Sequence, residues 1–96
     1  MNEMELMSNK LFTEKFGHNK STRFNKLKEE HNELQEAWKK YEEGTGSLEH
    51  VLEELSDTQA LLTHITGLLA TSHTELLINA IVKVEVREVN PMYKRN

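Results

Sequence analysis

The sequence predicts an all-α protein, a four-helix antiparallel bundle that assembles as a dimer or tetramer. Leu, Glu and Lys dominate the 96 residues, and only one proline and four glycines interrupt them, so helix is favoured along nearly the whole chain. Apolar residues recur at helical spacing in four segments, and short connections between long helices favour antiparallel neighbours. A single domain of this length has a small core, which favours oligomerisation.

The first predicted helix covers residues 4–16, with Gly17 suited to its C-terminal end. The second covers residues 22–43 and carries an apolar stripe with a seven-residue repeat. We expect Trp38 to lie in the core on this stripe, and His31, which fills the remaining position, to be a buried histidine. The stripe consists of Phe24, Leu27, Leu34, Trp38 and Tyr41.

The third predicted helix covers residues 48–70 and begins after Ser47, a favourable capping residue. The fourth opens with the capping-box pattern Ser72-x-x-Glu75 and continues to Val89. Residues 82–89 also alternate valine with charged residues, as a strand would, and the sequence leaves that alternative open. A lone strand has no partner, so helix is favoured, and the second apolar side of that helix indicates a subunit interface.

The chain as a whole is interpreted as one domain, 1–96, with flexible tails at 1–6 and 91–96. The absence of cysteine excludes disulfides and thiolate metal sites and favours a cytoplasmic protein. No apolar run reaches the length of a membrane span, and the net charge of −4 argues against nucleic acid as a partner.

Two acidic pairs at i, i+3 spacing, Glu30/Glu33 and Glu54/Asp57, stand on or beside apolar stripes. With about 100° per residue, Glu30 falls about 40° from Leu34, inside the stripe, and Glu33 falls at its edge. The second pair continues along its helix into apolar rows, whereas the rows of a solvated face would stay polar.

Carboxylates drawn toward a core need a cation, because two of them about 5 Å apart repel by about 3 kcal/mol at an effective dielectric of 20. An ion pair with Lys26 or Lys28 would be enough to compensate the charge of a single acidic pair. Two pairs on adjacent helices favour a divalent metal, and oxygen ligands favour Mg²⁺, with Mn²⁺ as a substitute. The di-iron alternative needs Glu-x-x-His motifs, which the chain lacks. His64, beside the apolar row, is expected to be buried rather than a ligand.

These motifs resemble those of the MazG-like all-α nucleotide pyrophosphohydrolases. Residues 26–37 (KLKEEHNELQEA) are similar to the family stretch KLxEExxELxEA, and residues 53–57 (EELSD) are similar to its EELxD stretch. Residues 12–17 (FTEKFG) resemble the lead-in helix of short members. The resemblance extends over about residues 7–87.

The resemblance implies Mg²⁺-dependent hydrolysis of a nucleoside triphosphate, or a related nucleotide, to a monophosphate and pyrophosphate by a homo-oligomer. It implies that Glu30, Glu33, Glu54 and Asp57 bind the metal. The identity of the general base stays open, with Glu33 as the residue we favour. A phosphoribosyl-ATP pyrophosphohydrolase-like activity would use the same site.

Phosphate contacts are expected from basic residues. The family often carries lysine, asparagine and arginine on its last helix; here Lys83, Arg87 and Asn90 occur at a different spacing, and Lys83 and Arg87 are the candidates. Lys26 and His18 are further candidates for substrate binding. The basic run Lys20, Arg23, Lys26 and Lys28 is suited to steering a triphosphate toward the acids.

A second class of function fits the same acidic residues. The chain would then be a non-catalytic helical oligomer that uses them to bind a structural metal or a basic partner. Metal binding without turnover would favour this alternative.

Overall fold

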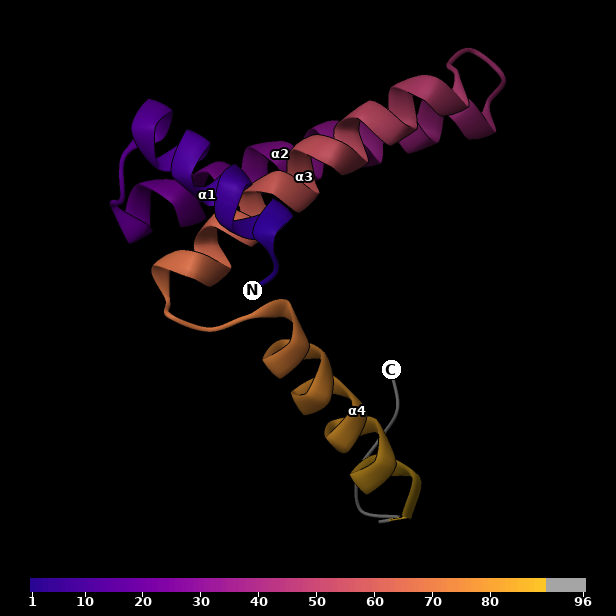
Figure 1. Cartoon of the computed structure of the whole chain (residues 1–96). Coiled ribbons are helices and arrows are strands. Elements are labelled where there is room, and N and C mark those ends of the chain that lie inside the picture. Colours follow the sequence, from indigo (N-terminus) through magenta and orange to yellow (C-terminus); the bar gives the residue numbers. More distant parts are fainter. Residues whose placement is uncertain (90–96) are drawn as a thin grey trace.

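The computed structural model describes residues 1–89, and within them the chain forms four α-helices and no strand (Figure 1). The prediction of an all-α chain with four helices is therefore confirmed, and residues 82–89 are helical. Asn90 and the predicted tail at 91–96 lie outside the described residues. The helices are α1 (Glu3–Phe16), α2 (Lys20–Glu42), α3 (Leu48–Leu68) and α4 (His73–Val89).

Side-chain caps fix where the helices begin. The Ser47 hydroxyl accepts a hydrogen bond from the His50 amide at 3.1 Å, which confirms the predicted cap of α3. Ser72 caps α4 in the same way through the Glu75 amide. The Asn19 carboxamide caps α2 through the Thr22 amide at 3.0 Å, so this helix begins two residues earlier than predicted.

The N-terminal helix is also longer than predicted. The Asn2 side chain accepts a hydrogen bond from the Glu5 amide at 2.8 Å, and the helix begins at Glu3, one residue before the predicted start. Residues 3–6 of the predicted tail at 1–6 are therefore helical. Gly17 ends this helix as predicted, with a φ of 77° that a residue with a side chain rarely adopts.

Helices α2 and α3 form an antiparallel hairpin, and α1 packs against α3 (Figure 1). The antiparallel register is visible in a hydrogen bond between Arg23, near the start of α2, and His64, near the end of α3. The core of this three-helix unit is small, as its size requires. Its buried apolar residues are Ala37, Val51, Leu61 and Ile65.

Helix α4 leaves the three-helix unit at an angle of 96° to α3 and packs extensively against none of the other helices (Figure 1). Among its described side chains, only that of the first residue, His73, is hydrogen-bonded to α3, at 2.8 Å to Thr63 and 3.5 Å to Gln59. Its apolar side chains are therefore exposed in the single chain, and a closed four-helix arrangement stays a prediction for an oligomer. The exposed residues are Leu76, Leu77, Ile78, Ile81, Val82, Val84 and Val86.

Across residues 1–89, no helix by itself combines the length and apolar character needed to cross a membrane. The pair α3 and α4 meets both requirements jointly, but it is sharply bent at the connection between them.

Two predictions of burial on α2 were wrong. Trp38 is 45% exposed, stacked only against Tyr41 at 5.5 Å between ring centroids, and His31 is exposed. The reason is that α3 covers one side of α2, and no second helix covers the other near the loop end of the hairpin. His64 is buried as predicted, with 1% of its surface exposed.

Candidate metal centre

Three of the four predicted metal ligands converge between α2 and α3. The carboxylates of Glu30, Glu33 and Glu54 each offer an oxygen within 4.8 Å of the others. The first two share a face of α2 because they are three residues apart, and the antiparallel hairpin brings Glu54 opposite them. The fourth predicted ligand, Asp57, is exposed one turn further along α3 and lines a pocket together with Glu30.

Two carboxylate oxygens of this cluster are buried without a partner in the described part of the chain. Oε2 of Glu30 and Oε2 of Glu54 are both shielded from solvent, and neither has a hydrogen-bond partner among the described residues. The two side chains are only 13% and 15% exposed. A buried carboxylate oxygen without a partner is costly, and a metal ion supplies what it lacks.

Burial and mutual repulsion raise the pKa of both acids. For Glu30, desolvation is the largest cause and the charge of Glu33 the next, while Lys26 acts in the opposite direction. For Glu54, desolvation again comes first, followed by the charges of Glu33 and Asp57. The folded chain therefore holds these acids in an environment that opposes their negative charge.

The donor set fits a hard divalent cation. All the converging atoms are carboxylate oxygens, the ligands that Mg²⁺ and Mn²⁺ accept in proteins, and neither sulfur nor imidazole belongs to the cluster. Glu30 and Glu54 are pre-positioned by the hairpin, whereas Glu33 is exposed and able to adjust. The carboxylates thus fit the predicted metal, with Asp57 close enough to influence the pKa of both buried acids.

Lys26 lies on the rim of the centre, as its predicted role in substrate binding requires. Its ammonium group is 2.9 Å from Oε2 of Glu29 and 3.9 Å from Oε1 of Glu30. The hydrogen bond with Glu29 is the main reason that the pKa of Lys26 is raised. Lys26 shares the pocket with both Glu30 and Asp57.

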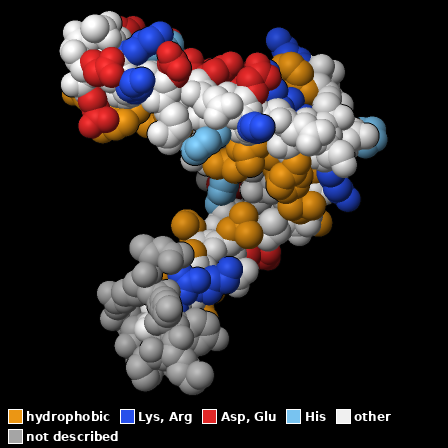
Figure 2. Space-filling view, turned by 180° about the vertical axis from the view of Figure 1, so that it is seen from behind, with side chains coloured by type: hydrophobic (Ala, Val, Ile, Leu, Met, Phe, Trp, Pro, Cys, Tyr) orange, Lys and Arg blue, Asp and Glu red, His pale blue; other side chains and the backbone are white. Residues whose placement is uncertain are grey.

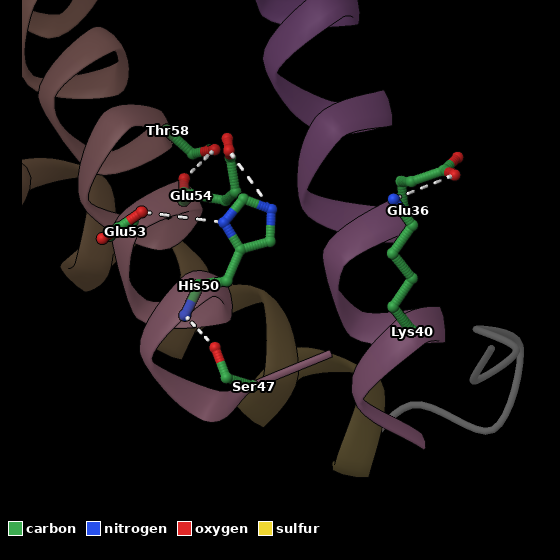
Figure 3. Close-up of polar contacts among 7 residues, drawn as sticks. All are labelled: Glu36, Lys40, Ser47, His50, Glu53, Glu54 and Thr58. Carbon is green, nitrogen blue, oxygen red and sulfur yellow. Dashed lines mark hydrogen bonds and ion pairs between the residues drawn. The ribbon is translucent and has the colours of Figure 1, made fainter. Parts of the chain in front are cut away.

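His50 is a neighbour of the centre that the sequence reasoning missed. Figure 3 shows its ring between two carboxylates of α3, with Nδ1 3.6 Å from Glu53 and Nε2 3.9 Å from Glu54. The signal in the sequence was the spacing of four residues between His50 and Glu54, which places both on one helix face. The charge of a protonated His50 would lower the pKa of Glu54, against the other causes.

The remaining predicted substrate contacts are not gathered at the acids within one chain. His18 lines a neighbouring pocket with Gly17, Asn19 and Lys20, which shares only Phe16 and Thr22 with the pocket of Glu30. Lys83 and Arg87 lie on α4, away from the hairpin. Figure 2 shows hydrophobic side chains where α4 leaves the other helices and basic side chains further along α4.

The pocket beside the acids measures about 670 Å³ and has a mixed lining. Phe12, Phe16 and Leu61 supply apolar surface, and the rest of the lining includes charges of both signs. Among those charges is Arg23, which the sequence placed only in a basic run and which is in fact 94% buried, since 6% of its surface is exposed.

Comparison of the chain with protein-family models, with curated proteins and with solved structures found no match.

Proposed function

We propose that this protein is a Mg²⁺-dependent nucleotide pyrophosphohydrolase of the MazG-like type. The observation that carries the proposal is the convergence of Glu30, Glu33 and Glu54 with two buried carboxylate oxygens that lack a partner. The resemblance of residues 26–37 and 53–57 to the family motifs supplies the reaction. The substrate is a nucleoside triphosphate or a related nucleotide, and the products are a monophosphate and pyrophosphate.

Each acid has a defined part in this proposal. Glu30, Glu33 and Glu54 hold the metal, and Asp57, at the mouth of the pocket, completes the set. When bound, Mg²⁺ supplies positive charge for phosphate oxygens and acidifies a water molecule. Glu33 is the exposed member of the cluster, so it is the carboxylate best able to accept a proton from that water.

The pocket combines charged and aromatic residues, as a nucleotide substrate requires. Lys26 stands beside the acids, where it offers a positive charge to the phosphate chain. Phe12 and Phe16 form an aromatic wall, with ring centroids 5.6 Å apart, against which a nucleobase or sugar can pack. His18 lies just beyond this wall.

A homo-oligomer, in the cytoplasm, is part of the same proposal. The exposed apolar side chains of α4 need a cover, and a second copy of the chain provides a matching surface by symmetry. Lys83 and Arg87 would then reach an acidic centre from a neighbouring copy. A dimer or tetramer would in this way complete both the bundle and the site.

The test is release of pyrophosphate and monophosphate from a panel of ribo- and deoxynucleoside triphosphates, with phosphoribosyl-ATP included, in the presence of Mg²⁺ or Mn²⁺. Glu54→Gln and Asp57→Asn are measured beside the wild type. Glu36→Gln serves as a matched control, because among the described residues Glu36 pairs only with Lys40, on the outer face of α2 (Figure 3). We expect turnover that needs the metal, falls at least about a hundredfold in Glu54→Gln, and persists in the control.

The same experiment separates the non-catalytic alternative. A folded protein that binds Mg²⁺ through Glu54 but turns over no nucleotide in the panel would be a metal-binding helical oligomer. A protein that neither binds the metal nor turns over nucleotide would contradict the proposed enzyme and a structural metal site, and of the alternative it would leave only the binding of a basic partner.

A further inference from the structure

Arg23 is the most deeply buried arginine or lysine in the described part of the chain, and no acid there pairs with it. It is 6% exposed, and no carboxylate among residues 1–87 lies within ion-pair distance of its guanidinium. A nearly buried charge without a counter-ion is strongly unfavourable unless something else compensates it. The two partners that Arg23 does have orient it without neutralising it.

The first partner is an aromatic ring. The guanidinium carbon lies 4.7 Å from the centroid of the Phe16 ring, a cation–π contact that holds the plane of the group. Phe16 in turn stacks near Phe12 at the end of α1. The wall of the pocket and the orientation of Arg23 are therefore set by the same helix.

The second partner is His64. Nε of Arg23 donates a hydrogen bond to Nδ1 of His64 at 3.1 Å, so Nδ1 carries no proton and the ring is neutral. The proton sits on Nε2, which donates to the Thr13 hydroxyl at 3.0 Å. Three helices thus contribute to one buried network, in which Arg23 is the only charged member.

The hydrogen bond to His64 leaves the other N–H groups of the guanidinium without a hydrogen-bond partner among the described residues. Arg23 also lines the pocket that contains Lys26, Glu30 and Asp57. Seven residues separate Arg23 from Glu30 on α2, which is two turns, or about 10 Å along one side of the helix. The four remaining N–H groups form a planar fork suited to the oxygens of a phosphate group.

We propose that Arg23 is a phosphate-binding residue, held in place by Phe16 and by the chain Thr13–His64, and that it receives the phosphate chain of the substrate at the end of the pocket away from the acids. The inference rests on the proposed function for the identity of the anion as a nucleotide. The anion site itself requires only a phosphate chain and not its hydrolysis.

The experiment measures binding of inorganic tripolyphosphate by calorimetry, in EDTA and again with Mg²⁺, so that no turnover is needed. Arg23→Lys keeps the charge but loses the fork, and Arg23→Gln loses both. Lys39→Gln removes one positive charge from an exposed position of the same helix, on the side opposite Arg23, and serves as the matched control. Circular dichroism establishes that each variant is folded.

We expect tripolyphosphate to bind the wild type and Lys39→Gln within about twofold of each other, and Arg23→Gln about ten- to a hundredfold more weakly. Arg23→Lys should lie between them, and it carries the test alone if Arg23→Gln does not fold. The proposal would be overturned if Arg23→Lys and Arg23→Gln both bound tripolyphosphate with the affinity of the wild type. If Arg23→Gln is unfolded, wild-type affinity in Arg23→Lys would overturn it. So would a wild type that binds no tripolyphosphate. A protein that binds it through Arg23 but hydrolyses no nucleotide would contradict the proposed function and leave the anion site standing.

Discussion

Arg23 and Glu30 lie two turns apart on one side of α2 and line the same pocket. Among the described residues, the buried Arg23 has no acid partner, and one buried oxygen of Glu30 has no hydrogen-bond partner. Left apart, each group is unfavourably placed, because burial penalises an uncompensated charge of either sign. A metal ion at the acids and a phosphate chain reaching Arg23 would satisfy both. The pocket therefore favours a ligand that carries both charges, such as a metal-bound polyphosphate.

Glu54→Gln is expected to stabilise the metal-free protein while it removes the response to metal. The substitution takes a desolvated negative charge away from Glu30 and Glu33, for a gain of about 1 kcal/mol, or about 4–8 °C in Tm. Thermal melts at pH 7.5 in EDTA and in 10 mM Mg²⁺, which is about a thousand times a Kd of about 10 µM, measure both effects. In Glu36→Gln the metal response should be retained, and a Glu54→Gln protein that still gains stability from Mg²⁺ would exclude Glu54 as a ligand.

The contribution of Glu30 and Glu54 to the stability of the metal-free protein should decrease as the pH rises. The pKa values of Glu30 and Glu54 are raised in the folded state, so that state binds more protons than the unfolded one. The stability they contribute is fully present below pH 4.5 and is lost as the pH rises through the raised values. Denaturant unfolding in EDTA from pH 4.5 to 7.5, compared with Glu30→Gln/Glu54→Gln, isolates this contribution, and parallel curves for the two proteins would refute it.

His64 should act in the opposite direction. Desolvation first and the charge of Arg23 second lower the pKa of His64, so the unfolded state binds the extra proton between the lowered value and 6.5. Stability is then lost as the pH falls through this window. Glu30 and Glu54 change stability in the opposite direction, so the contribution of His64 is best measured by denaturant unfolding of the Glu30→Gln/Glu54→Gln protein. Adding His64→Gln to that protein should remove its loss of stability below pH 6.5. Persistence of that loss would point to a different group.

A charge on the outer surface of α4 should dissociate the oligomer. Ile81 is 57% exposed in the single chain, and Ile81→Lys would place an unpaired charge in an interface made by this helix. We expect the wild type to be a dimer or tetramer by light scattering at micromolar concentration, and the variant to associate at least about tenfold more weakly. Glu85→Gln, on the same helix, should assemble normally. A monomeric wild type would contradict the proposed interface.

Subunit mixing tests whether Arg87 serves the centre of a neighbouring copy. Glu54→Gln and Arg87→Gln are each expected to have low activity as pure proteins. If Arg87 acts across the interface of a dimer, equal mixing should restore activity to about a quarter of the wild-type value, because half of the dimers are mixed and each holds one intact site. Light scattering of differently tagged chains shows that the subunits have exchanged. If activity does not recover after exchange, Arg87 acts with the acids of its own chain or lies outside the site.

The elements of this fold were largely predictable, because local chemistry decides them. Ser47 and Ser72 cap the helices where the sequence placed caps, and Gly17 ends α1 with a positive φ. Residues 82–89 required a comparison of alternatives, since valines at every second position also suit a strand. They are helical, in continuity with the preceding residues of α4.

The acidic centre was predictable in part. The angular position of Glu30 inside the apolar stripe and of Glu33 at its edge corresponds to their observed burial, half-buried and exposed. Asp57 was grouped with Glu54 by spacing, by the rows that continue along the helix and by the resemblance of residues 53–57. In the structure it is exposed and lines the pocket with Glu30, outside the cluster of three converging carboxylates. Trp38 was assigned to the core because helical periodicity identifies an apolar face without showing whether a neighbour covers it.

By itself the sequence determined four helices, their caps, and an acidic cluster placed against apolar rows, because periodicity, capping chemistry and charge are properties of short segments. Only the tertiary structure decided that Arg23 is buried and held by His64, 41 residues away, and that α4 leaves the hairpin with its apolar side chains exposed. Such relationships depend on which helices meet and at what angle. That outcome follows from the packing of the whole chain, which no local pattern of residues specifies.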